Sequence, residues 1–120
     1  MATATDEELI TQVALDYFEG WFDGDVARID RALHPDLVKR GRGEQQAASL
    51  GILTKSRMLE LTAEGTGAED AADRRLDVTI EDVYDGIASV TVRSAVYHEY
   101  LHLVRTSDGW KIANALFQLT

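Results

Sequence analysis

The chain has 120 residues, a formal net charge of -9 and no cysteine. This length suits one domain over residues 1–120, and the missing cysteine excludes disulfides, thiolate zinc sites and cysteine nucleophiles. The negative charge disfavours nucleic acid and anionic membrane surfaces as partners, and no apolar run is long enough to span a bilayer. The first ten residues are acidic and lack a basic stretch, so we expect no secretory signal and a cytoplasmic location.

Two helices are predicted in the first third of the chain. Thr5 begins a capping box, apolar residues then recur at three- and four-residue spacing, and Gly24 is a natural residue to end the helix. Asp25 is placed to cap a shorter second helix, and Pro35 stops it.

The middle of the chain is less regular. A short strand is predicted at residues 37–40, followed by a segment without clear pattern at 41–51. Thr54 is placed to cap a third helix that ends at Gly65. The stretch 65–73 is small, acidic and poor in large apolar groups, which predicts a loop.

From residue 76 onward the apolar period changes towards two, as in strands. Asp85-Gly86 and Asp108-Gly109 predict hairpin turns. Three helices on one face of an antiparallel sheet make an α+β fold. Alternation along the last strand predicts one face with Trp110, Ile112, Asn114 and Leu116, and another with Lys111, Ala113, Ala115 and Phe117.

One face of this sheet is expected to meet the helices, while the other is left partly bare. A bare apolar sheet face usually meets a partner, which predicts a homodimer through the outer face of the sheet. The residues expected there are Tyr100, Val104, Ala113, Ala115 and Phe117.

The segment His98-Glu99-Tyr100-Leu101-His102 matches the H-E-x-x-H pattern of zinc proteases, which requires a helix. Its flanks favour a strand, in which residues four apart lie roughly 13 Å apart, too far for one metal ion. No third ligand follows in the sequence, so we predict no metal site and interpret both histidines as sheet residues.

Two residues are the candidates for acid–base chemistry. Tyr17 lies on the apolar stripe of the first helix, so its hydroxyl points inward and serves either as a reagent or as a hydrogen-bonded core group. His34, before Pro35, serves as a base or ligand contact, or else caps the helix end. Trp21, one turn beyond Tyr17, is expected to form a wall of the same site.

The candidates for ligand binding are more scattered. Lys39 and Arg40 alternate on the short strand, so only one of them can face inward, and a buried arginine would require an anion. Arg93 carries the same ambiguity, and Asn114 on an apolar face must find a hydrogen-bond partner. The remaining candidates, interpreted as lining or core, are Met58 and Phe117.

The chain resembles the NTF2-like superfamily in its order of elements and in several short motifs. These motifs are Tyr17-Phe18-Glu19-Gly20-Trp21 before Gly24-Asp25, then the stretch Arg31 to Asp36, and a D-G-W-K-I ending from Asp108. Within it the chain is most similar to the branch labelled putative lumazine-binding, near the SnoaL-like proteins. The resemblance covers nearly the whole chain. It implies a cone in which a strongly curved sheet wraps around helices and leaves an apolar pocket, with dimers through the convex face.

The resemblance extends to ketosteroid isomerases, which carry a catalytic tyrosine on the first helix eight residues before the aspartate of the G-D pair. Tyr17 and Asp25 have this spacing. The isomerase base is an aspartate on the first strand, where this chain has Lys39-Arg40-Gly41. The hydrogen-bond donor is therefore matched and the carboxylate base is not, which argues against steroid isomerase activity. Basic residues in place of the acid suit an anionic ligand instead.

Three functions remain open. The first is a small-molecule-binding protein with an apolar pocket for a flat, anionic ligand, with or without acid–base chemistry. The second is an isomerase, lyase or hydrolase for polyketide-like or terpene-like substrates, and the third is a protein-interaction module without catalysis. No cofactor is expected in any of them, because the sequence has no phosphate-binding loop or other cofactor motif.

Overall fold

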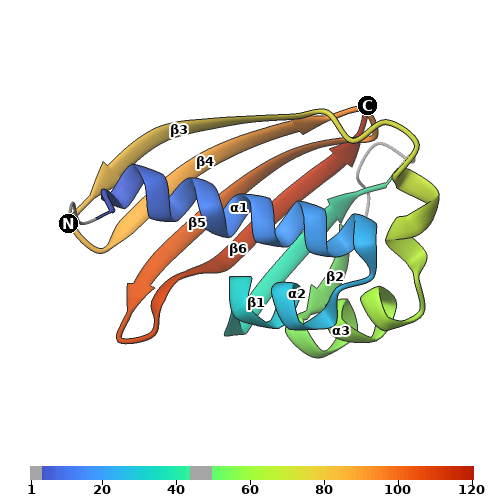
Figure 1. Cartoon of the computed structure of the whole chain (residues 1–120), viewed down its shortest axis with the longest axis horizontal. Coiled ribbons are helices and arrows are strands. Elements are labelled where there is room, and N and C mark those ends of the chain that lie inside the picture. Colours follow the sequence, from blue (N-terminus) through green and yellow to red (C-terminus); the bar gives the residue numbers. More distant parts are fainter. Residues whose placement is uncertain (1–3, 44–49) are drawn as a thin grey trace.

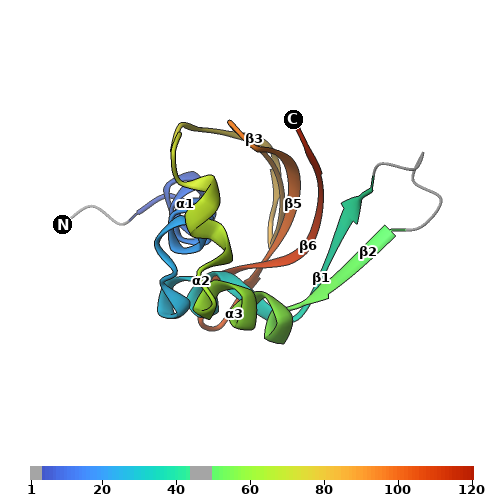
Figure 2. The same cartoon turned by 90° about the vertical axis from the view of Figure 1, so that its right-hand side faces the viewer.

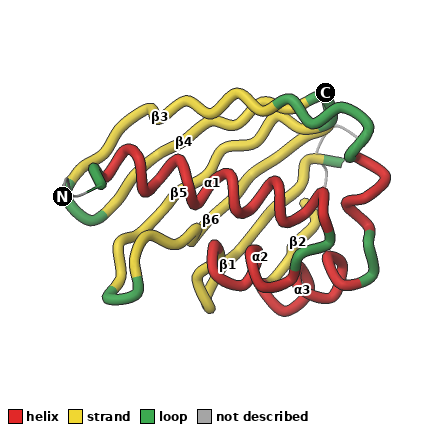
Figure 3. Tube along the Cα trace, in the orientation of Figure 1, coloured by secondary structure: helices red, strands yellow, loops and turns green. Residues whose placement is uncertain are grey.

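The computed structural model describes residues 4–43 and 50–120, with four helical segments and six strands (Figures 1 and 3). The α-helices are α1 (Asp6–Asp23), α2 (Val26–Ala32) and α3 (Lys55–Ala63), and η1 (Thr66–Asp70) is a 3₁₀ helix. The strands are β1 (Leu33–Arg42), β2 (Leu50–Thr54), β3 (Leu76–Tyr84), β4 (Ile87–Ser94), β5 (Tyr97–Thr106) and β6 (Gly109–Leu119).

Local capping signals set the helix boundaries, as predicted. The hydroxyl of Thr5 accepts from the amide of Glu8 at the start of α1, and Gly24 ends α1 in the left-handed conformation, with φ of 67°. Asp25 caps α2 and Thr54 caps α3 in the same way as Thr5. Helix α2 ends at Ala32, before the predicted Pro35, because the chain already enters β1 at Leu33.

The six strands form one sheet in the order β2-β1-β6-β5-β4-β3. The prediction of an antiparallel sheet is wrong at one pairing, because β1 and β6 run parallel and the sheet is mixed. Parallel pairing is possible here because the whole β3–β5 meander separates these two strands in sequence, so no tight turn joins them. The C-terminal strand thus lies in the middle of the sheet.

Helix α1 covers one face of the sheet, and α2 and α3 lie below the C-terminal half of α1 (Figures 1 and 2). We call this the inner face and the opposite one the outer face. The core between the layers is built from α1 residues such as Ile10 and Phe18 and from strand residues such as Val90 and Leu101, all at most 3% exposed. Strands β1 and β2 project away from the layer, and we call them the β1–β2 extension (Figure 2).

A β-bulge in β6 changes which residues of this strand face the core. His102 pairs with Asn114 but Leu103 pairs with Ile112, so Ala113 is an extra residue without a partner. An extra residue shifts the alternation by one position. Beyond Ala113 the buried side is therefore that of Ala115, and the predicted faces of the final residues are exchanged: Asn114 and Leu116 lie outside, while Ala115 and Phe117 lie inside.

Two segments differ from the predicted secondary structure. Strand β2 begins at the end of the segment 41–51, in which no clear pattern was visible, and it pairs with residues 38–42. Positions 44–49 of that segment lie outside the described residues. The predicted loop at 65–73 contains η1, whose Gly67 packs directly on α1. Both elements depend on contacts distant in sequence. No helix in the described part of the chain is long and apolar enough to cross a membrane.

Candidate functional site

The structure divides the sequence-predicted site residues between two places on opposite faces of the sheet. One place is the space between α1 and the inner face, which we call the inner cavity. It contains a polar cluster that is surrounded by Tyr17, Trp21 and Phe117. Arg40, Arg93 and Asn114 line a hollow on the outer face, which we call the outer groove. Met58 and His34 lie in neither.

The inner cavity is organised around three charged or hydroxyl groups from three elements. Tyr17 on α1 donates a hydrogen bond of 2.7 Å to the Oε2 atom of Glu99 on β5. The Nζ atom of Lys39 on β1 donates to the same tyrosine oxygen and lies 3.6 Å from Glu99 Oε2. All three side chains are buried, with Glu99 only 1% exposed. A donor pair and a carboxylate acceptor thus lie side by side in the interior.

Aromatic rings enclose the ammonium group of Lys39. Its Nζ atom lies 4.6 Å from the ring centroid of Phe117, 5.1 Å from that of Tyr17 and 6.0 Å from that of Tyr97. These distances are those of cation–π contacts. The bulge in β6 turns Phe117 inward, and Gly41 allows its close approach to β1, since a Cβ there would lie 2.8 Å from the ring. Residues of α1, β1, β5 and β6 thus form one enclosure.

Burial shifts the pKa values of Tyr17 and Lys39 in opposite directions. Burial raises the pKa of Tyr17 well above its usual value, and the negative charge of Glu99 raises it further. Burial lowers the pKa of Lys39, although the neighbouring Glu99 carboxylate opposes this shift. Tyr17 therefore stays protonated at neutral pH and acts as a hydrogen-bond donor. Lys39 and Glu99 offset one another's charge.

Asp70 of η1 joins two walls of the inner cavity. Its Oδ2 atom accepts hydrogen bonds from Trp21 Nε1 at 3.1 Å and from the Tyr97 hydroxyl at 2.5 Å. Burial raises the pKa of Tyr97, and its hydrogen bond to Asp70 adds to this effect. Because Trp21 lies on α1 and Tyr97 on β5, this Asp70 bridge holds the helix and the sheet together at the η1 end of the cavity.

The inner cavity is closed around these side chains. Its volume is about 10 Å³, which is close to the space one water molecule needs. At the η1 end the closure depends on Gly67, where a Cβ would lie within 2.7 Å of the carbonyl carbon of Trp21. A ligand larger than water can reach Tyr17 only if the surrounding segments move apart.

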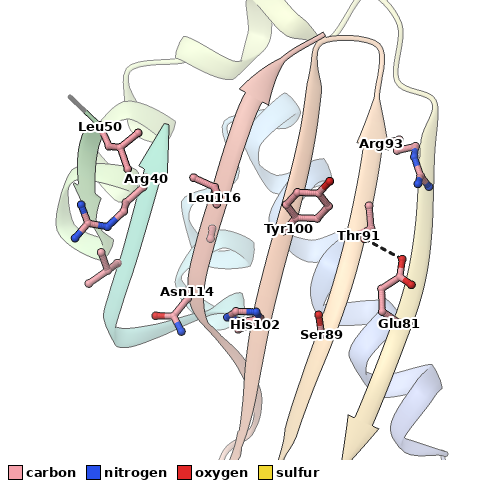
Figure 4. Close-up of a pocket in the computed structure, with 12 residues that line it drawn as sticks. Arg40, Leu50, Glu81, Ser89, Thr91, Arg93, Tyr100, His102, Asn114 and Leu116 are labelled. Atoms are coloured by element: carbon pink, nitrogen blue, oxygen red, sulfur yellow. Dashed lines mark hydrogen bonds between the residues drawn. The ribbon is translucent and has the colours of Figure 1, made fainter. Parts of the chain in front are cut away.

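The outer groove is larger and open to solvent, with a volume of about 840 Å³ (Figure 4). Figure 4 shows Arg40 on one side, Arg93 on the other, and Tyr100 and Asn114 between them. Lys39 and Arg40 thus alternate as predicted: Lys39 is the inward residue and Arg40 the outward one. Beneath Arg93, the Thr91 hydroxyl donates to the Glu81 carboxylate at 3.0 Å.

The two remaining candidates have structural surroundings. His34 lies at the start of β1, where its Nδ1 atom accepts a hydrogen bond of 3.0 Å from the amide of Asp36. Met58 is 1% exposed in the hydrophobic core, and its carbonyl accepts from the Thr62 hydroxyl. Neither residue lines the inner cavity or the outer groove.

Sequence analysis missed Glu99 and Asp70 as site residues. A signal for Glu99 was present, because alternation places it on the same strand face as Leu101 and Leu103. A carboxylate on an apolar face requires a buried partner. Asp70 carried no such signal, since it lies in an irregular acidic segment and its role depends on Trp21, 49 residues away.

The H-E-x-x-H segment is part of strand β5, as its flanks predicted. Glu99 points inward, whereas His102 faces the outer groove, so the motif does not gather its side chains at one point. Within residues 4–43 and 50–120, no group of three or more histidine, aspartate or glutamate side chains is placed to hold a metal ion.

Comparison with known proteins identifies both a family pattern and a fold. The sequence model of the family described as "Putative lumazine-binding" matches residues 5–118. An NTF2-like protein of unknown function from Silicibacter pomeroyi superposes with a TM-score of 0.75 at 17% identity, covering 100% of both chains. A second one, from Methylobacillus flagellatus, gives 0.72 at 18% identity, covering 99% of this chain and 95% of that one.

A ketosteroid isomerase-like protein from Erwinia carotovora atroseptica superposes with a TM-score of 0.62 at 17% identity, covering 92% of this chain and 93% of its own. Identities this low establish the fold alone, which is the predicted α+β NTF2-like arrangement. A search of curated proteins gives no significant match.

Proposed function

The chain belongs to the putative lumazine-binding family, and we propose that it binds a small, flat heteroaromatic molecule in the inner cavity. The observation that carries this proposal is the pairing of donors and acceptor inside an aromatic enclosure. Lys39 and Tyr17 supply the donors, and Glu99 supplies a carboxylate acceptor 2.7 Å from the tyrosine oxygen.

The adjacent hydrogen-bond donors and acceptor of the inner cavity match the edge of a cyclic amide or imide. A cyclic amide or imide presents a carbonyl oxygen next to an N–H group, and lumazine, a bicyclic pteridine, has such edges. The carbonyl would accept from Lys39, or from Tyr17 once its single O–H turns from Glu99 to the ligand, and the N–H would donate to Glu99. Rings such as those of Trp21 and Phe117 suit the faces of a flat ligand. Because Lys39 and Glu99 offset each other, a neutral ligand fits better than an anion.

Binding requires the inner cavity to open, since about 10 Å³ is far below the few hundred Å³ of an ordinary ligand site. Trp21 and Tyr97 are partly exposed walls, and both are held by Asp70. Separation of the Asp70 bridge would therefore provide access, with the ligand taking the space between these rings.

Calorimetric titration with lumazine tests this proposal. We expect lumazine to bind, and quinoxaline, a flat bicycle without an N–H or carbonyl group, to bind at least tenfold more weakly. Tyr17→Phe should weaken lumazine binding about tenfold, the value of one hydrogen bond to a polar group. Tyr84→Phe is the matched control, because Tyr84 is 74% exposed. Equal lumazine affinity of the wild type and the folded Tyr17→Phe protein would exclude the inner cavity.

A second candidate is proton transfer next to a ketone, and the position of Glu99 favours it. Sequence analysis found the tyrosine of an isomerase without a carboxylate base, but Glu99 brings a carboxylate to Tyr17 from β5. In this reaction Glu99 would remove a proton from the carbon beside a carbonyl, and Tyr17 would donate a hydrogen bond to the resulting enolate. NMR would follow deuterium exchange at the α-carbons of cyclic ketones in heavy water.

The exchange experiment has a direct control in the two glutamates. Glu99→Gln should abolish exchange if the reaction takes place, whereas Glu81→Gln, which alters an outer-face carboxylate, should leave it unchanged. Exchange no faster than in buffer alone would leave the protein a binder rather than an isomerase.

We also propose a homodimer through the outer face. Large apolar side chains are exposed there, among them Tyr100 at 52%, Leu116 at 44% and Leu50 at 39%, and these three line the outer groove. Apolar surface of this extent favours burial against a partner. Light scattering should give twice the chain mass of 13.3 kDa, and a species of 13.3 kDa at micromolar concentration would contradict the dimer.

A further inference from the structure

Charged side chains on the outer face are separated by sign. On the β1 side, Arg40 and Arg42 project outward beside the apolar residues of the groove. On the β3 side, the charged residues facing outward include Asp77, Glu81 and Asp82. Arg93 lies beside Asp77, at 3.9 Å, so Glu81 and Asp82 remain as the acidic excess of that edge.

An apolar band separates the two edges. Tyr100 and Leu116 lie in the middle of the outer groove, on β5 and β6 (Figure 4). The β1–β2 extension adds Leu50 and Ile52, which pair with Arg42 and Arg40 and are 39% and 59% exposed. A two-stranded ribbon that projects from its sheet is marginally stable unless its apolar side is covered. The outer face therefore offers a basic edge, an acidic edge and a centre where Tyr100 and Leu116 lie among polar side chains such as His102 and Asn114.

Two copies can pack these faces together about either of two kinds of two-fold axis. An axis parallel to the strands lays the β1–β2 extension of one copy over the β3 edge of the other. An axis across the strands lays each edge over the same edge of its partner. The second arrangement opposes arginine to arginine and carboxylate to carboxylate, and like charges in contact disfavour association.

We propose that this protein forms a dimer about a two-fold axis parallel to its strands, with Arg40 of each copy facing Glu81 of the other. The strand registers place Arg40 level with Thr91, and the Thr91 hydroxyl donates to the Glu81 carboxylate. The proposal rests on the outer-face dimer proposed above and adds its orientation. The arrangement is closed, because each copy supplies one basic and one acidic edge and the two contacts are identical.

Charge reversal of single residues tests the orientation. Each of the variants Arg40→Glu and Glu81→Arg places two like-charge contacts in the dimer. Each should therefore raise the dissociation constant of the dimer about tenfold or more, as measured by sedimentation velocity. Both residues are on the surface, so both variants should keep the wild-type circular dichroism spectrum. Glu7→Arg is the control for Glu81→Arg, because it makes the same charge change on an exposed position of α1.

An equimolar mixture of the two variants gives the decisive result. In a mixed dimer the new glutamate at position 40 faces the new arginine at position 81, while the other contact is the native one. The mixture should therefore regain the wild-type dissociation constant within about threefold, as should the double variant alone. A dimeric wild type whose variants are not restored by mixing would overturn the orientation and leave the dimer standing. A monomeric wild type would overturn both.

Discussion

Lys39→Met lowers the free energy of unfolding by about 3–5 kcal/mol, the usual cost of removing one partner from a buried ion pair. The reason is the position of Glu99, which is 1% exposed and has Lys39 as its cationic partner at 3.6 Å. Without the ammonium group the Glu99 carboxylate remains buried beside Tyr17 only. Urea unfolding monitored by circular dichroism measures the change.

Two further variants separate this effect from a general loss of packing. Lys111→Met removes an exposed lysine that donates to a backbone carbonyl, and it should cost less than about 1 kcal/mol. The triple variant Tyr17→Phe/Lys39→Met/Glu99→Leu replaces the polar cluster by apolar groups of similar size, so it should be more stable than Lys39→Met. A triple variant less stable than Lys39→Met would show that the charges themselves are not the source of the loss.

Gly67→Ala lowers the free energy of unfolding by about 3 kcal/mol, at the upper end of the cost of overpacking. The added methyl group would lie within 2.7 Å of the carbonyl carbon of Trp21, and backbone atoms cannot turn aside as a flexible side chain can. We expect η1 to separate from α1, which breaks the hydrogen bonds of Asp70 to Trp21 and Tyr97.

Hydrogen exchange at residues 66–70 and the fluorescence of Trp21 report this separation directly. In Gly67→Ala, exchange in η1 should rise at least tenfold and the Trp21 emission should move to longer wavelength. Gly86→Ala is the matched control, because no atom lies within 4 Å of a Cβ at that turn. Equal stability of the two alanine variants would contradict the close contact. If lumazine binds, its association should also be faster in Gly67→Ala.

The features that could be predicted from the sequence are those fixed by neighbouring residues. Thr5, Asp25 and Thr54 are bonded to amides three positions away, so their capping is visible in a short window. The hairpin turns at Asp85 and Asp108 are equally local. These signals indicate the order of the elements, and the resemblance to the NTF2-like superfamily rested on that order together with short motifs such as Gly24-Asp25 and the D-G-W-K-I ending from Asp108.

The features that could not be predicted depend on which strands meet. The bulge at Ala113 left no mark in the alternation of β6, since Ala113 and Ala115 fit either face, yet it exchanges the faces of Asn114 and Phe117. The partnership of Tyr17 and Glu99 joins residues 82 positions apart. Predicting it requires the registers of β4, β5 and β6, which the sequence pattern leaves undetermined.

The central place of β6 has a consequence for the synthesis of this chain. Strand β6 lies between β1 and β5, and it is synthesised after the other five strands of this sheet. Until residues 109–119 have emerged, β1 and β5 have no common neighbour and their pairing edges stay open. Such edges and the uncovered apolar core favour aggregation of incomplete chains. Nascent chains that stall before Trp110 should therefore depend on chaperones more than chains that extend past Leu119.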